Sequence, residues 1–383
     1  MSPDCIDKYN MAKYILTINF SQSDGSILPN ILKKIEPNIE SGYHSNNGRM
    51  DKFTFGKYSF EIEMERDVKI DSENVLSKSN GSVFRQIRKA LLVFYAVSVP
   101  WPKVKNLVLT TFDAKGKAKK KIIRDFRQPL QNTNENNWAF RPDNMDFVKY
   151  VMQENEEGEA FRNSLVNYLL SFTDTSIYSS FEKAWRALDI LGLYNADTTK
   201  ESESLALLKK QIYEHPELFK YLADILVNQT TDEERASFMI GGFMRLSTFK
   251  WFDLFISLVN EGKIKDLTRR LTEFKDFRIN NLFRRIIDEN NKLKNYLAEN
   301  DKLEEIENHF ESCKDIECPI DFVVLFCISY SYFIRSKITH AEVFDNSFSL
   351  ELTKEEKQIE WLTGCLQRLV KIIYSNPKLL RKI

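Results

Sequence analysis

An arginine and a histidine stand five positions apart in the segment YSYFIRSKITHAE, residues 330–342. Arg335 follows a run of apolar residues, and His340 is one of only four histidines in the chain. Histidine titrates near neutral pH and can therefore move protons, whereas arginine keeps its positive charge and stabilises anions. This pair is the strongest candidate for catalytic chemistry in the sequence.

The spacing of the pair sets a geometric condition on any site that uses both side chains. On a regular helix five residues correspond to a rotation of roughly 500°, so the side chains of Arg335 and His340 diverge by about 140°. Ser336 lies four residues before His340, shares its face and could orient the imidazole ring. A common pocket therefore requires a bent helix end or a surface that wraps around the helix, such as a second copy of it.

Signatures of several other chemistries are absent from the sequence. It contains no G-x-x-x-x-G-K-[ST] loop, no G-x-G-x-x-G loop and no G-x-S-x-G elbow. The other histidines, His44, His215 and His309, are far apart, and the five cysteines complete no zinc spacing. We therefore expect neither a bound metal nor another cofactor.

Charge is balanced over the whole chain, because its 383 residues include 55 basic and 55 acidic ones. Any anion-binding surface must therefore be local. The densest candidate is the run Lys115–Arg127, which has seven cations and one acid. This run could follow a nucleic-acid backbone, or it could be a charged hairpin tip that keeps the protein soluble.

The first part of the chain predicts an α+β module. The strand-like segments, rich in β-branched and aromatic residues, are 13–20, 52–65 and 105–113. Gly56 splits the second segment into a hairpin, and the residues after Asp113 are expected to return as a strand with a Lys-Gly tip. Between the strands, residues 82–99 predict a helix that must stop at Pro100.

From about residue 156 the pattern is helical. Residues 179–194 place five apolar side chains on one face: Phe181, Ala184, Trp185, Leu188 and Leu191. Further helices are predicted around 204–214, 217–228, 232–246, 249–260, 276–298 and 302–313, from about 320, and at 354–374. We therefore predict an α+β domain over 1–155 and an all-helical domain over 156–383.

The segment RSKITH, residues 335–340, resembles the motif of the HEPN superfamily of helical ribonucleases, in the branch that reads Arg-Asn-x-x-x-His. An apolar helix leads into the motif, a long final helix follows it, and an earlier amphipathic helix contains the acidic sequence ALD with Asp189. The resemblance implies an all-α HEPN-like bundle over about 176–383, with inserted helices in 195–319. Ser336 departs from the motif, where Asn, Asp or His is usual.

The resemblance implies metal-independent cleavage of single-stranded RNA, in which the 2′-hydroxyl attacks the neighbouring phosphorus and leaves a 2′,3′-cyclic phosphate. His340 would move protons, and Arg335 would stabilise the phosphoryl oxygens. Ser336 and Asp189 would support them, although Asp189 could instead be an exposed helix residue that pairs with Arg186. The candidate RNA-binding residues are Lys119, Lys120, Lys121 and Lys337.

Sites of this family commonly form where two copies meet, so the resemblance implies a homodimer. It also implies a role in bacterial defence against phage or as a toxin, with an antitoxin or trigger partner and with 1–155 as the sensor or substrate-recruiting domain. The alternative is a catalytically silent HEPN-type module for dimerisation or RNA binding, which Ser336 favours.

The expected location is the cytoplasm, without membrane spans. No signal peptide is recognisable at the N-terminus, and the five cysteines form no disulfide framework. The apolar runs 90–101 and 320–334 are both shorter than the roughly 20 residues that a bilayer requires. Both runs are therefore expected to be buried core elements.

Overall fold

The computed structural model of the protein describes most of the chain. The described residues are 12–21, 26–27, 38–42, 50–66, 70–71, 75–76, 81–99, 101–113, 115–130, 145–173, 176–228, 261–289, 291–339 and 354–380. The helices predicted around 232–246 and 249–260 lie outside these ranges.

Two compact units make up the described structure. The first comprises the described residues of Met1–Ser204 and Leu366–Ile383, and the second those of Leu205–Phe344 and Leu350–Cys365. An α+β N-terminal region followed by helices is therefore confirmed. The predicted domain boundary after residue 155 lies inside the first unit, which also includes the C-terminal residues.

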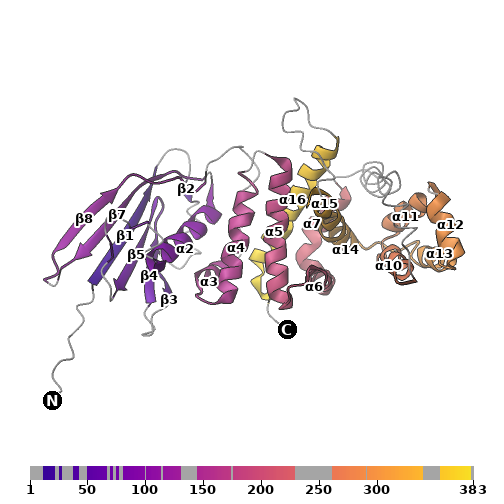
Figure 1. Cartoon of the computed structure of the whole chain (residues 1–383), viewed down its shortest axis with the longest axis horizontal. Coiled ribbons are helices and arrows are strands. Elements are labelled where there is room, and N and C mark those ends of the chain that lie inside the picture. The colour runs from indigo at the N-terminus through magenta and orange to yellow at the C-terminus, as the bar shows by residue number, and fades with distance from the viewer. Residues whose placement is uncertain are drawn as a thin grey trace, which may run out of the picture. The chain divides into compact units, whose positions relative to one another are not determined.

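A six-stranded antiparallel sheet forms the N-terminal part of the first unit (Figure 1). Its strands are β1 (Ala12–Phe20), β3 (Asn38–Gly42), β4 (Met50–Phe55), β5 (Ser59–Arg66), β7 (Val104–Phe112) and β8 (Ala118–Ile123). They lie in the order β3-β4-β5-β1-β7-β8, so β8 is an edge strand. A separate antiparallel pair joins β2 (Ser26–Ile27) to β6 (Ser98–Val99).

One face of the sheet is buried, as the alternating apolar pattern predicts. The buried residues of β1 are Tyr14, Leu16, Ile18 and Phe20. Helix α2 (Gly81–Val97) lies against this face, where the rings of Phe20 and Phe94 stack with their centroids 4.0 Å apart (Figure 1). The helix ends at Val97, close to the stop predicted at Pro100.

Both predicted hairpins form. The backbone N–H of Gly56 donates to the carbonyl of Ser59 at 2.7 Å and closes the turn between β4 and β5. The turn between β7 and β8 contains Gly116, whose φ of 75° lies in the left-handed region that glycine tolerates best. Local turn chemistry was therefore sufficient to place both hairpins.

The helices of the first unit pack on aromatic residues. They are α3 (Phe147–Met152), α4 (Glu156–Leu170), α5 (Ile177–Ala196), the last part of α16 (Lys354–Ser375) and the 3₁₀-helix η2 (Pro377–Leu380). Figure 1 shows α4 and α5 side by side. The hydroxyl of Tyr374 donates to the carbonyl of Phe161 at 3.1 Å, and their rings meet edge to face. All five residues predicted to form the apolar face of α5 are buried.

All the secondary-structure elements described in the second unit are helices. Its helices are most of α6 (Glu201–Glu214), α7 (Pro216–Asn228), α10 (Glu261–Leu271), α11 (Phe277–Glu289), α12 (Asn291–Glu299), α13 (Leu303–Ser312), α14 (Ile320–Val323), the π-helix η1 (Val324–Tyr330), α15 (Ser331–Thr339) and the first part of α16. Residues 276–298, predicted as one helix, thus contain two helices, α11 and α12. None of the described helices has the length and apolarity needed to cross a membrane.

Candidate functional site

Arg335 and Ser336 lie on α15, and both side chains are half-buried. His340 lies outside the described residues, and the side chain of Lys337 is also not described. The distance between the two members of the candidate catalytic pair therefore stays a prediction. What the structure does give is the environment of Arg335 and Ser336.

The faces of α15 differ sharply in exposure. Ser331 and Ile334 are 0% and 7% exposed and form its buried face, whereas Tyr332 is 39% exposed. At 100° per residue, Arg335 lies between the buried face and Tyr332, whereas Ser336 lies about 40° beyond Tyr332, away from the buried face. The helix therefore places Arg335 at the margin of the core, where its side chain is half-buried.

A π-helix leads directly into α15. In η1 all residues except Ser329 are buried, and the Ser331 hydroxyl donates to the carbonyl of Phe326, five residues earlier, at 2.7 Å. The ring of Phe326 also meets Trp361 of α16 edge to face, with centroids 5.3 Å apart. Because a π-turn takes more residues than an α-turn, counting 3.6 residues per turn across 320–339 misplaces the faces of α15. No pattern in the sequence indicated this π-helix.

Asp189 lies on α5 in the first unit, whereas Arg335 and Ser336 belong to the second. Its side chain is half-buried, and its Oδ1 is shielded from solvent. The alternative predicted that Asp189 is an exposed helix residue, and its half-buried side chain shows that this part of the prediction is wrong. A role of Asp189 beside the Arg–His pair stays a prediction.

The three candidate lysines of β8 do not share one surface. Lys119 is paired in register with Thr111, and Lys121 with Leu109, so both point to the face of the sheet that α2 covers. Lys120 points to the opposite face. Lys119 and Lys120 are exposed, and Lys121 is half-buried. Adjacent side chains on a strand always point to opposite faces. The prediction of one RNA-binding group, Lys119–Lys121, did not include this alternation.

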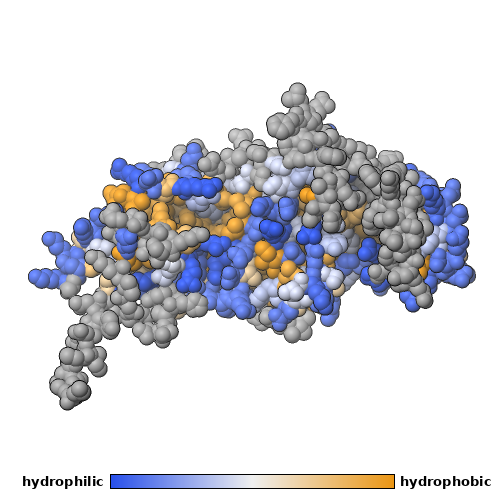
Figure 2. Space-filling model, in the orientation of Figure 1, coloured by the Kyte–Doolittle hydropathy of each residue, from blue (hydrophilic) through white to orange (hydrophobic). Residues whose placement is uncertain are grey.

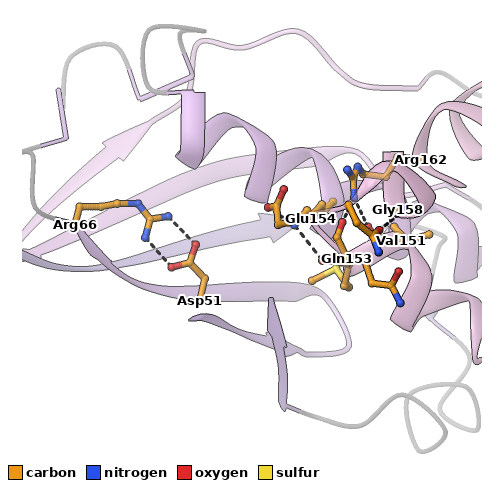
Figure 3. Close-up of polar contacts among 10 residues, drawn as sticks. Asp51, Arg66, Val151, Gln153, Glu154, Gly158 and Arg162 are labelled. Carbon is orange, nitrogen blue, oxygen red and sulfur yellow. Dashed lines mark hydrogen bonds and ion pairs between the residues drawn. The ribbon is translucent and has the colours of Figure 1, made fainter. Parts of the chain in front are cut away.

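The first unit contains a cluster of cationic side chains that the sequence did not indicate. Figure 3 shows part of it, around Glu154 and Arg162. Lys89 of α2 is 1% exposed, and its Nζ donates to Glu154 Oε1 at 2.5 Å and to the carbonyl of Met152 at 3.1 Å. Burial lowers the pKa of Lys89 to about 8, although the hydrogen bond that Lys89 donates to Glu154 opposes that shift. Nearby, Arg162 donates to the carbonyls of Val151 and Gln153. The cluster ties α2 to the segment between α3 and α4.

A second polar cluster lies in the second unit, around two buried carboxylates. Asp321 accepts hydrogen bonds from the Tyr213 hydroxyl at 2.9 Å and from the backbone N–H groups of Lys275 and Asp276 at 2.6 and 2.8 Å. Asp276 accepts from the backbone N–H of Cys318 at 2.7 Å. These bonds join α6, α14 and the start of α11, so the cluster is structural.

Arg278 completes this cluster. Its Nε and Nη2 donate to the two carboxylate oxygens of Asp276 at 2.9 and 2.8 Å. Burial together with the charge of Asp321 raises the pKa of the Cys318 thiol to about 11. Among the described residues, no group of three or more His, Cys, Asp or Glu side chains is arranged to hold a metal ion.

Comparison with known proteins gives no relative. No family model, no curated protein and no solved structure matches the chain. The arrangement of its own residues is therefore the basis for any functional proposal.

Proposed function

We propose that the protein is an endoribonuclease that cleaves single-stranded RNA without a metal ion, at a site that includes Arg335, Ser336 and His340. The observation that supports it most is the position of Arg335 at the margin of the core, on a helix whose preceding segment is almost completely buried. A guanidinium held in this way loses less conformational freedom when it binds a phosphoryl group than one on a mobile loop.

The reaction balances with the chain's own groups. A proton leaves the 2′-hydroxyl, a bond forms between the 2′-oxygen and phosphorus, and the bond from phosphorus to the 5′-oxygen breaks. The 5′-oxygen takes up a proton and leaves as a hydroxyl. His340 moves these protons, and Arg335 stabilises the charge that grows on the phosphoryl oxygens. Ser336 orients the imidazole ring.

The decisive experiment incubates the purified protein with a labelled single-stranded RNA in EDTA. We expect products that end in a 2′,3′-cyclic phosphate from the parent protein. We expect a loss of about 10²-fold or more in rate for Arg335→Ala and for His340→Ala. The matched controls Arg186→Ala and His215→Ala, which remove an exposed residue of the same type, should keep the parent rate.

Two further substrates sharpen this test. DNA of the same sequence, and RNA with a single 2′-deoxynucleotide at the cleaved position, should both survive because they lack the attacking hydroxyl. Cleavage that requires added magnesium would contradict the proposal.

The second candidate function is a catalytically silent module for dimerisation or RNA binding, and the serine at position 336 is the feature that favours it. Intact RNA, bound equally by the parent, Arg335→Ala and His340→Ala proteins, would support this function instead.

The proposed cellular role is that of a toxin or phage-defence nuclease held in check by a partner. Expression of the parent should then slow growth, and His340→Ala should relieve the effect. Equal toxicity of the two proteins would contradict this role.

A further inference from the structure

The β7–β8 hairpin, defined here as residues 103–127, concentrates positive charge in a chain whose net charge is zero. It contains nine cationic residues and two acidic ones. Figure 1 shows β8 as the outermost strand of the sheet, and Figure 2 shows hydrophilic residues at the turn end of this hairpin. The positive charge is therefore concentrated at the edge of the sheet that β8 forms.

Eight of these nine cations are exposed, and the described residues give them no carboxylate partner. The exposed ones are Lys103, Lys105, Lys115, Lys117, Lys119, Lys120, Arg124 and Arg127. None of these eight forms an ion pair with another residue in the described part of the chain. In the second unit, by contrast, Lys294, Lys302 and Lys314 lie 2.8, 2.7 and 2.7 Å from a carboxylate oxygen. The hairpin thus differs from a solvated surface whose charges neutralise each other.

Hydrogen bonds to Asp113 brace the turn of the hairpin. Asp113 Oδ1 accepts hydrogen bonds from the backbone N–H groups of Lys115 and Lys117 at 2.9 and 2.7 Å. The N–H of Gly116 donates to the carbonyl of Asp113 at 2.9 Å. One of the two acids in the hairpin therefore serves the turn itself, and the neighbouring lysines project from a fixed frame.

The cations point in several directions from an edge that is open among the described strands. Lys119 and Lys120 lie on opposite faces of β8, and Lys117 lies in the turn. From Lys117 to Arg124 the chain extends over roughly 24 Å at about 3.4 Å per residue. A flexible chain of phosphates can wrap around such an edge and contact both faces at once.

A duplex fits this surface less well. A two-stranded ribbon can enter the major groove of DNA, but here β7 is hydrogen-bonded to β1 and cannot be inserted together with β8. A rigid double helix would therefore meet the cations of one face at a time. Charged side chains, especially lysines, also protect an exposed sheet edge from strand pairing, but that role does not require cations in the turn and in the flanking segments, where this hairpin also carries them.

We propose that the β7–β8 hairpin binds the sugar–phosphate backbone of a single-stranded nucleic acid, independently of sequence. Both aromatic residues of the hairpin, Phe112 and Phe126, are half-buried, so charge rather than base stacking drives binding. The inference rests on the proposed function for the identity of the natural ligand as RNA, and it makes the hairpin the surface that recruits the substrate.

The test measures binding in a His340→Ala background, so that cleavage does not consume the probe. Fluorescence anisotropy follows labelled 20-nucleotide oligouridylate over a range of salt concentrations. The test variant is Lys117→Gln/Lys119→Gln/Lys120→Gln. The matched control removes three exposed lysines elsewhere, as Lys220→Gln/Lys357→Gln/Lys378→Gln. Thermal melting by circular dichroism checks that both triple variants fold.

For the hairpin variant we expect affinity at low salt to fall about tenfold or more. The slope of log Kobs against log salt should decrease in magnitude by about 2, since each lost contact to a single strand contributes about 0.7. The control variant should match its background in both quantities. Oligothymidylate of the same length should bind similarly, because the shared backbone is recognised.

Two results would overturn the inference. One is equal loss of affinity in the hairpin and control variants. The other is tighter binding of polyglutamate than of oligouridylate, which would assign the hairpin to an acidic protein. Failure of the parent protein to cleave RNA, with hairpin-dependent binding intact, would remove the nuclease and leave this inference standing.

Discussion

Arg66 and Asp51 form a bidentate ion pair inside the first unit, with Nη1 and Nη2 of the arginine 2.7 and 2.6 Å from the two carboxylate oxygens (Figure 3). The side chains are only 4% and 1% exposed. Arg66 Nε also donates to the Ser82 hydroxyl at 3.2 Å, which links the end of β5 to the start of α2. The pair therefore fixes the β4–β5 hairpin against the helix that covers the sheet.

Removing one partner of this pair should destabilise the protein strongly. Asp51→Asn leaves the Arg66 charge buried without its counterion, and we expect the free energy of unfolding to fall by about 3–5 kcal/mol. Replacing both, as Asp51→Asn/Arg66→Met, should cost less than the sum of the single changes. Urea unfolding followed by circular dichroism measures all three.

The control for the Asp51 and Arg66 variants is Lys13→Met. Lys13 lies 3.6 Å from Glu63 in an exposed ion pair on the same sheet, so its loss should cost less than about 1 kcal/mol. A similar cost for Asp51→Asn and Lys13→Met would show that the buried pair contributes no more than a surface pair.

Lys89 predicts a rise in stability with pH. Burial lowers its pKa from 10.5 in the unfolded chain to about 8 in the folded one, so between these values the unfolded chain binds more protons. The contribution of this group to the free energy of unfolding therefore increases from about pH 8 upward, by up to about 3 kcal/mol in total. Lys89→Met should remove that increase.

The measurement compares urea unfolding of the parent and Lys89→Met proteins at several pH values from 7 to about 9.5, below the range in which tyrosines ionise. Lys149→Met, which removes a lysine 68% exposed, is the control and should follow the parent curve. If the difference between the parent and Lys89→Met stays constant with pH, the pKa of Lys89 is not lowered by folding.

Cys318 should react slowly for a half-exposed thiol. Burial and the charge of Asp321 raise its pKa to about 11, so at pH 8 only about one molecule in 10³ carries the reactive thiolate. Asp321→Asn removes that charge and should speed alkylation of Cys318 several-fold. Peptide mapping by mass spectrometry after timed iodoacetamide treatment reports this cysteine separately from the others.

Glu273→Gln is the control for that experiment, because Glu273 pairs with Lys209 at 2.6 Å and does not contact Cys318 in the described structure. An unchanged rate in Asp321→Asn would show that burial alone suppresses the thiolate.

Ser336 gives a graded test of the proposed nuclease. If its hydroxyl orients His340, Ser336→Ala should lower kcat by about tenfold with little effect on KM. Ser336→Asn, which restores the residue usual in the motif that 335–340 resembles, should keep or raise the rate. A faster Ser336→Ala enzyme would contradict the orienting role.

Local patterns determined much of the fold. The alternating apolar residues of β1, the glycine turns at Gly56 and Gly116 and the 3.6-residue rhythm of α5 all correspond to elements of the structure. Each of these signals depends on neighbours within a few residues, so it can be recognised without knowing the tertiary structure. Within α5, the partial burial of Asp189 was not predicted, because it depends on the elements that surround the helix.

Pairings between distant residues could not be predicted in this way. Lys89 meets Glu154 across 65 positions, and Tyr213 meets Asp321 across 108. Whether such a polar residue is buried with a partner depends on how separate elements pack, and no spacing rule encodes that. The same limit explains why the π-helix before α15 was missed, because its hydrogen-bond pattern shifts within a run of apolar residues.

The sequence by itself therefore determined the strands β1, β4, β5, β7 and β8, several of the helices, the charge of the β7–β8 hairpin and the candidate residues Arg335 and Ser336. Only the tertiary structure decided which environment those residues occupy: α2 covers the face of the sheet to which Lys119 and Lys121 point, and the π-helix η1 shifts the helical register that leads into α15. The physical reason is that secondary structure follows from local backbone preferences, whereas exposure and charge pairing follow from the packing of distant segments.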